Sequence, residues 1–177
     1  MAWRGLLRGG DLHAVLSVRR QLVSGGAAAL VLTLVLAAPA GAVVVPQRGM
    51  KGVRLGWTKA QVRGELGSPD RFIVRRNEIT GHDLAYRYGL TEVVFAARGT
   101  RVTAITTTSR RERTARGVGI GSTAATVAAR VPGARCTREA GVRHCHVGAF
   151  LPGRTVTDFL LNRRGRVKRI VVARVID

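Results

Sequence analysis

The residues of this 177-residue chain best suited to chemistry are two cysteines and two histidines. Cys136 and Cys145 are the only cysteines, and His144 and His146 flank the second of them. One interpretation is a disulfide across a hairpin that turns at Gly141. The alternative is a metal site of two thiolates and two imidazoles. On a strand, however, Cys145 points away from both histidines, because neighbouring side chains alternate between faces. The sequence therefore favours the disulfide and no metal.

Catalytic groups are harder to find. Ser68 and Ser122 flank predicted helices, Ser109 lies in a predicted linker, and none sits in a G-x-S-x-G turn. His82 and Asp83 are adjacent, but they fall in a glycine-containing turn, where a solvated loop is the simpler interpretation. Because no nucleophile and base can be paired, we expect a protein that is not an enzyme and needs no cofactor.

The chain is strongly basic, with 30 Lys and Arg against 10 Asp and Glu, a formal net charge of +20. Its arginines cluster in "RRERTAR" (110–116) and "NRRGRVKR" (162–169), either as solvated turns or as a surface for an anionic cell-wall polymer or a membrane surface. Few aromatic residues and no recognisable motif argue against specific nucleic-acid binding. The candidate binding residues in the two clusters are Arg110, Arg111, Arg113, Arg163, Arg164 and Arg166.

Residues 1–42 have the features of a targeting segment. Arg19 and Arg20 precede an uncharged run that ends in "APAGA", where small residues would permit cleavage. The alternative is an uncleaved N-terminal membrane anchor, because residues 25–46 carry no charge. Both alternatives place the folded part outside the cytoplasm, so we expect a secreted or extracytoplasmic protein.

Two segments of the chain repeat each other. A shift of 65 positions superimposes "GVRLGWTKAQVRGELGSPD" (52–70) on "GVGIGSTAATVAARVPGAR" (117–135). Each has a threonine N-cap, Thr58 or Thr123, followed by apolar residues on one helical face. Gln61 would complete a capping box with Thr58. The pattern predicts two short helices that end at glycine and proline.

Strand-like segments follow each helix, rich in β-branched and aromatic residues and separated by turn residues. We therefore predict an α+β fold of two tandem repeats, each a short helix followed by an antiparallel meander of three or four strands. The expected boundaries are 43–108 for the first repeat, 109–116 for a basic linker and 117–177 for the second repeat.

The pattern G-x-T-K-x-x-V-x-x-x-L-G-x-P, followed by Y-x-Y, V-x-F and V-x-x-I, resembles the SmpA/OmlA (BamE-like) domain. In tandem it resembles the β-lactamase inhibitor protein, whose two similar halves form a concave surface that grips another protein. The resemblance implies a non-catalytic binding module for an envelope or extracellular protein. The alternative function is adhesion to a polyanion through the arginine clusters.

Three aromatic residues are candidates for the binding surface. Tyr86 and Tyr88 share one sheet face, which either packs on the helix as core or forms an open binding surface. Trp57 precedes the first helix, where the second repeat has Ser122, so the fold alone does not require a tryptophan there.

Overall fold

The computed structural model describes residues 43–77, 81–96 and 100–176. The predicted signal peptide or anchor (1–42) lies outside these residues. Within them the chain forms twelve strands and two helices, so it is mostly β. Neither described helix has the length and apolarity needed to span a bilayer.

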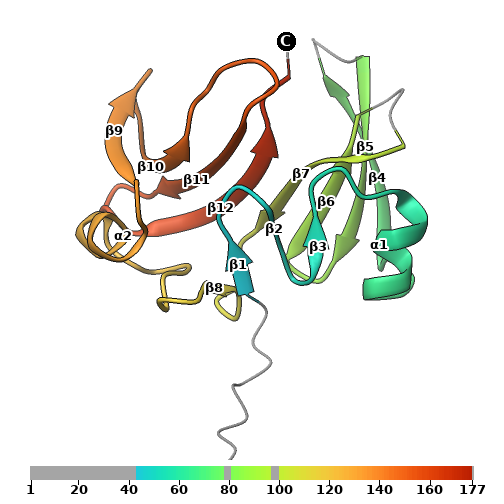
Figure 1. Cartoon of the computed structure of the whole chain (residues 1–177), viewed down its shortest axis with the longest axis horizontal. Coiled ribbons are helices and arrows are strands. Elements are labelled where there is room, and N and C mark those ends of the chain that lie inside the picture. The colour runs from blue at the N-terminus through green and yellow to red at the C-terminus, as the bar shows by residue number, and fades with distance from the viewer. Residues whose placement is uncertain (1–42, 78–80, 97–99, 177) are drawn as a thin grey trace, which may run out of the picture. The chain divides into compact units, whose positions relative to one another are not determined.

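Eight strands form one large antiparallel sheet (Figure 1). In spatial order they are β4 (Arg71–Asn77), β5 (Gly81–Tyr88), β6 (Thr91–Phe95), β7 (Val102–Thr107), β12 (Val167–Arg174), β11 (Thr155–Leu161), β10 (Val142–Gly148) and β9 (Arg135–Glu139). The central pair, β7 and β12, joins segments more than sixty residues apart, with Ile105 opposite Val172. Strands β4 and β9 are the two edges.

The helices begin where the sequence placed them. α1 (Lys59–Leu66) starts at Thr58, whose hydroxyl accepts a hydrogen bond from the amide of Gln61, and the Gln61 side chain completes the capping box. α2 (Ala124–Arg130) starts at Thr123, whose hydroxyl accepts from the amide of Thr126. α1 ends at a glycine in the left-handed region, Gly67.

A second, four-stranded sheet comes from segments that have no strand periodicity. Its strands, in spatial order, are β3 (Val53–Arg54), β2 (Gly49–Met50), β1 (Val43–Val45) and β8 (Arg113–Thr114). β1 and β8 pair in parallel, with Val43 opposite Arg113. This pairing brings the start of the described chain to the segment between the two groups of large-sheet strands.

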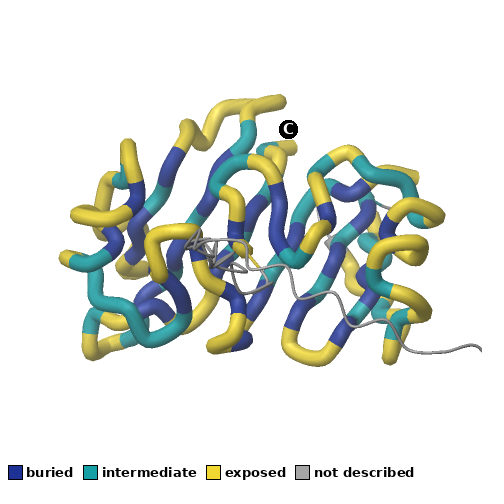
Figure 2. The backbone as a smooth tube through the Cα atoms, turned by 60° about the horizontal axis from the view of Figure 1, so that its bottom comes forward, coloured by how far each residue is buried: buried dark blue, intermediate teal, exposed yellow. Residues whose placement is uncertain are grey.

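The core lies on one face of the large sheet. Both helices and the small sheet contribute to it, through residues such as Val62, Val127 and Met50. On this face, one row of side chains contains one residue from each of seven neighbouring strands. That row is Phe72, Tyr86, Val93, Ile105, Val172, Thr157 and Val147. In Figure 2 the strands alternate between buried and more exposed positions, as expected for a sheet covered on one side.

The predicted fold class, an α+β fold of two tandem helix-plus-meander repeats, is wrong. The strands expected in separate meanders continue edge to edge as one sheet, and a second sheet exists that was not predicted. A separate meander would leave the edge of β7 or β12 unpaired, whereas joining them satisfies both edges. The described residues of both expected repeats belong to one compact unit, and β8 lies inside the segment expected as a linker.

Candidate functional site

The face of the large sheet opposite the core has no helix packed on it within the described residues. One row of side chains crosses this open face, with one residue from each of the eight strands, and seven of them are polar. The row is Arg71, Arg87, Glu92, Thr106, Val171, Asp158, His146 and Arg135. Register alone brings these residues together, because a strand places every second side chain on the same face.

Glu92 organises one half of the open face. It accepts hydrogen bonds from Arg87, with Nε 3.1 Å from Oε1, and forms an ion pair with Arg75 at 2.7 Å between Nη2 and Oε2. Both arginines and Glu92 line a shallow pocket of about 350 Å³, together with Leu90 and Arg169. Arg169 has no ion-pair partner among the described residues, so the pocket keeps a positive charge.

Two opposing effects set the pKa of Glu92. Partial burial acts to raise it, but hydrogen bonds and charge attraction from Arg87 and Arg75 outweigh burial, so the pKa lies below its ordinary value. The carboxylate is therefore ionised at neutral pH and holds both guanidinium groups against the sheet.

The other half of the open face carries a histidine cluster. His144 is buried, and its Nδ1 lies 2.8 Å from Oδ1 of Asp158 on the neighbouring strand. His146 lies beside it, with 5.4 Å between the ring centroids. The ring of Phe150, from the β10–β11 loop, lies 5.8 Å from His144 and 5.0 Å from His146.

Burial dominates the electrostatics of this cluster. Desolvation raises the pKa of Asp158 above its ordinary value, although the hydrogen bond with His144 opposes the shift. Nε2 of His144 and Nδ1 of His146 are buried without a hydrogen-bond partner among the described residues. Oε2 of Glu139 lies 4.0 Å from Nε2 of His144. The cluster thus has unused hydrogen-bonding capacity, which lies beneath the surface of the folded chain.

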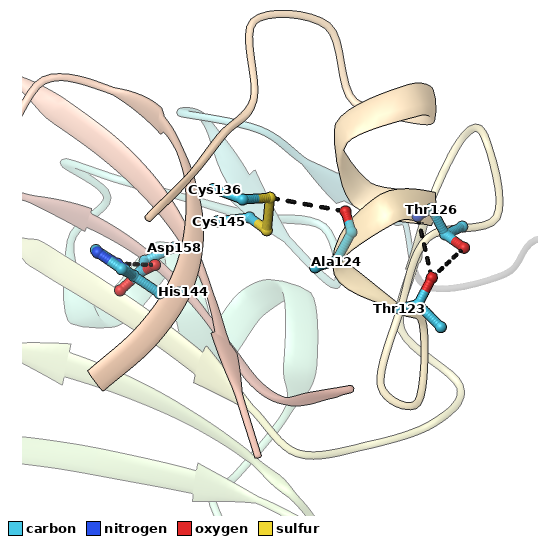
Figure 3. The surroundings of a disulfide bond; sticks show 7 residues. All are labelled: Thr123, Ala124, Thr126, Cys136, His144, Cys145 and Asp158. Atoms are coloured by element: carbon cyan, nitrogen blue, oxygen red, sulfur yellow. Dashed lines mark hydrogen bonds and ion pairs between the residues drawn. A yellow bond between two sulfur atoms is a disulfide. The ribbon is translucent and has the colours of Figure 1, made fainter. Parts of the chain in front are cut away.

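Cys136 and Cys145 are joined in a disulfide, as predicted. They lie directly opposite each other on β9 and β10, so the thiols are not available as metal ligands. Figure 3 shows the disulfide between the sheet and α2, with the His144–Asp158 pair on the other side of the strands. Cys136 Sγ lies 3.6 Å from the carbonyl oxygen of Ala124, which places the bridge at the start of α2.

The aromatic candidates do not form an open surface. Tyr86 and Tyr88 are 2% and 6% exposed and lie beneath α1. Of the two alternatives for this face, the structure therefore has the one in which it packs on the helix as core. Arg63 Nη2 donates to the hydroxyl of Tyr86, and the hydroxyl of Tyr88 donates to the carbonyl of Gly67, so α1 satisfies both. Trp57 is half-buried and packs against the same core. Packing therefore explains why the first segment has a tryptophan where the second has Ser122.

The arginine candidates divide into two groups. Arg113 donates to the carbonyl of Gly117 and Arg166 to that of Gly121, so each stabilises a turn. The side chains of Arg110, Arg111, Arg163 and Arg164 are exposed. Between Arg111 and Arg113, Glu112 is 3% exposed, so this segment is partly packed against the fold.

Sequence reasoning missed the residues of the open face. Glu92, Asp158 and the two arginines that bind Glu92 belong to different strands, and no local motif marks them. Alternation along β5 places Arg87 on the face opposite Tyr86 and Tyr88. The signal that could have found the row is the strand register, which depends on pairing over long sequence distances.

No family model matches the sequence, and no curated protein matches it. Among solved structures, the chain is similar to an extracellular protein containing an SCP domain from Bacillus anthracis, with a TM-score of 0.46 and 8% identity over 68% of this chain and 44% of that one. It is similar to a DUF4309 family protein from Bacillus subtilis, with a TM-score of 0.42 and 12% identity over 71% of this chain and 84% of that one. It is also similar to a cysteine-rich secretory protein from Staphylococcus aureus, with a TM-score of 0.40 and 8% identity over 68% of this chain and 44% of that one.

The chain therefore spans less than half the length of the first and third of these proteins. At these low scores and identities, none of the likenesses assigns a family or a function. The resemblance to the SmpA/OmlA domain therefore stays a prediction.

Proposed function

We propose that this protein is an exported, non-catalytic binding module that holds a protein partner on the open face of its large sheet. The observation that carries the proposal is the polar row that crosses all eight strands on the face opposite the core. Export is supported by the uncharged N-terminal run in the sequence and by the disulfide, which persists in oxidising compartments.

The composition of the open face suits a protein interface. Arginine and aromatic residues contribute most to protein–protein binding, and this face has Arg75, Arg87 and Arg169 together with the exposed ring of Phe150. Leu90 adds an exposed apolar side chain at the rim of the pocket. Because β-sheet backbone is rigid, these groups are presented with little entropy left to lose on binding.

Charge indicates the kind of partner. The chain has a formal net charge of +20, and Arg169 is left without an ion-pair partner within the described part of the open face. A partner surface rich in carboxylates would be steered toward this face and would find guanidinium groups already held in place by Glu92. The proposed partner is therefore an acidic envelope or extracellular protein.

The test places a bulky side chain in the middle of the polar row. Thr106→Trp should abolish capture of the partner from envelope extracts by the full chain, because Thr106 lies on a central strand of the open face. Ala125→Trp is the matched control, since it adds the same side chain on the exposed side of α2. The captured protein is identified and its binding to both variants is measured by calorimetry.

Salt distinguishes this function from polyanion adhesion. Capture that persists from low to moderate salt is expected for a sheet-face interface, whereas adhesion through arginine clusters falls steeply with salt. Equal binding of the partner to Thr106→Trp and Ala125→Trp would exclude the open face as the interface.

A further inference from the structure

The structure holds a second cluster of cations, on the core-side face of the sheet and away from the open face. Arg138 and Arg143 lie directly opposite each other on β9 and β10. Together with Arg163 and Lys168 from the β11–β12 hairpin, they line a small pocket of about 200 Å³. The remaining lining residues are neutral, so four cationic residues line the pocket with no carboxylate among them.

Within the described residues none of these four side chains forms an ion pair. Like charges directly opposite each other across an antiparallel pair destabilise a sheet. The pocket on the open face differs in this respect, because Glu92 forms ion pairs with two of the arginines there. The Arg138–Arg143 pair thus has a cost that nothing in the described chain offsets.

The fold prevents the two arginines from separating. The disulfide Cys136–Cys145 joins the next pair on the same face, two residues from each arginine. The neighbouring hairpin is fixed too, because Oδ1 of Asn162 accepts hydrogen bonds from the backbone amides of Arg164 and Arg166. A Cβ added to Gly165 would lie 3.4 Å from Nη2 of Arg143, so this guanidinium rests against that turn.

From this arrangement we infer that the pocket between the β9–β10 and β11–β12 hairpins is a binding site for a single phosphate group. Planar guanidinium groups bind phosphate oxygens through paired, charge-assisted hydrogen bonds, and an anion at the centre would offset the repulsion between Arg138 and Arg143. The small volume suits one phosphate group, either as the free anion or as the headgroup of an anionic lipid. The site does not depend on the proposed function, since it lies on the opposite face.

The test measures binding of inorganic phosphate to the full chain by calorimetry, at ionic strength held constant with sodium chloride. The double variant Arg138→Gln/Arg143→Gln should weaken phosphate binding by more than about tenfold, because it removes two charge-assisted contacts. Arg48→Gln/Arg54→Gln is the matched control, since it removes the same charge around another arginine-lined pocket and should leave the affinity unchanged. Thermal melting provides a second readout: phosphate should raise the Tm of the native chain but not that of Arg138→Gln/Arg143→Gln.

Vesicles distinguish the two sources of phosphate. Co-sedimentation with phosphatidylglycerol in phosphatidylcholine, compared with phosphatidylcholine alone, shows whether the lipid headgroup is taken, and free phosphate should compete for it if both use the site. Equal losses in the two double variants would overturn the site, because they would show that net charge alone attracts the anion. Absence of phosphate binding together with absence of vesicle binding would overturn it as well.

Discussion

At the scale of single residues, Tyr86 links the sheet to α1. Its ring lies edge-on to Phe72 and Phe95, at 5.1 Å and 4.8 Å between centroids, and its hydroxyl accepts from Arg63. Tyr86→Ala should lower the free energy of unfolding by about 3–5 kcal/mol, and Tyr86→Phe by about 1 kcal/mol. Urea denaturation of the two variants provides the measurement.

Phe72→Ala is the control for Tyr86, because the Phe72 side chain is 58% exposed on the edge strand and its loss should matter far less. A Tyr86→Ala variant with the stability of Phe72→Ala would show that Tyr86 is not part of the core.

Two carboxylates, Asp158 and Glu92, should change the stability of the fold with pH in opposite directions. The pKa of Asp158 is raised in the folded protein, so the folded state binds more protons between the ordinary pKa of 3.8 and the folded value. Stability from this group therefore falls as the pH rises through that interval. The pKa of Glu92 is lowered from 4.5, so its stabilisation is present above 4.5 and is lost as the pH falls through the folded value.

Urea denaturation between about pH 3 and pH 7 separates the two effects. Relative to the native chain, Asp158→Asn should gain stability as the pH rises, whereas Glu92→Gln should lose stability. Parallel profiles for the two variants would show that the environments of the two carboxylates do not differ as the structure indicates.

At the scale of elements, the β9–β10 hairpin contains a strained turn. Val142 pairs with Glu139, so the turn consists of Ala140 and Gly141, and both have positive φ, 46° and 80°. This is the backbone of a two-residue hairpin turn that favours Asn-Gly. Ala140→Asn should therefore raise the free energy of unfolding by about 0.5–1 kcal/mol, because asparagine tolerates the left-handed region better than alanine.

Gly141→Ala is the matched change in the opposite direction, and it should destabilise the hairpin because a Cβ is unfavourable at φ 80° even in open space. Chemical denaturation measures both variants. Equal stability of Ala140→Asn and the native chain would show that the turn carries no strain at Ala140.

The elements that the sequence predicted well are those with local signals. The Thr58–Gln61 capping box, the hairpin turn at Gly141 and the pairing of Cys136 with Cys145 each depend on residues close together in the chain. The small sheet could not be predicted this way. Its strands have two or three residues, too few for periodicity, and β1 is completed by β8 some seventy residues later.

The candidate site shows the same limit. Alternation predicted that Tyr86 and Tyr88 share a face but not which face α1 covers. The contact of His144 with Asp158 depends on the register between β10 and β11, which is set by burial of Cys145 and Phe159 on the other face. The joining of two groups of strands at β7 and β12 depends on unpaired edges, a property of the assembled sheet that no single segment reveals.

At the scale of the molecule, the strands on both sides of the β7–β12 pair should unfold together. Ile105 and Val172 are fully buried against each other at this junction. Gln47 reaches from the β1–β2 turn to β11, where its amide donates to the hydroxyl of Thr157 and its side chain to the carbonyl of Thr155. Because the core is shared, neither group of strands keeps its buried surface without the other.

This cooperativity can be measured with one probe in each group of strands. In the full chain with Trp3→Phe, Trp57 is the only tryptophan, and its fluorescence reports on the residues around α1. Amide exchange of β11, followed by mass spectrometry across the same urea series, reports on the other group. The two midpoints should coincide.

Val172→Ala should then lower both midpoints equally, although Val172 lies on β12, because its removal opens a cavity against Ile105 on β7. A shift confined to the β11 probe would show that the eight-stranded sheet consists of two independently stable parts.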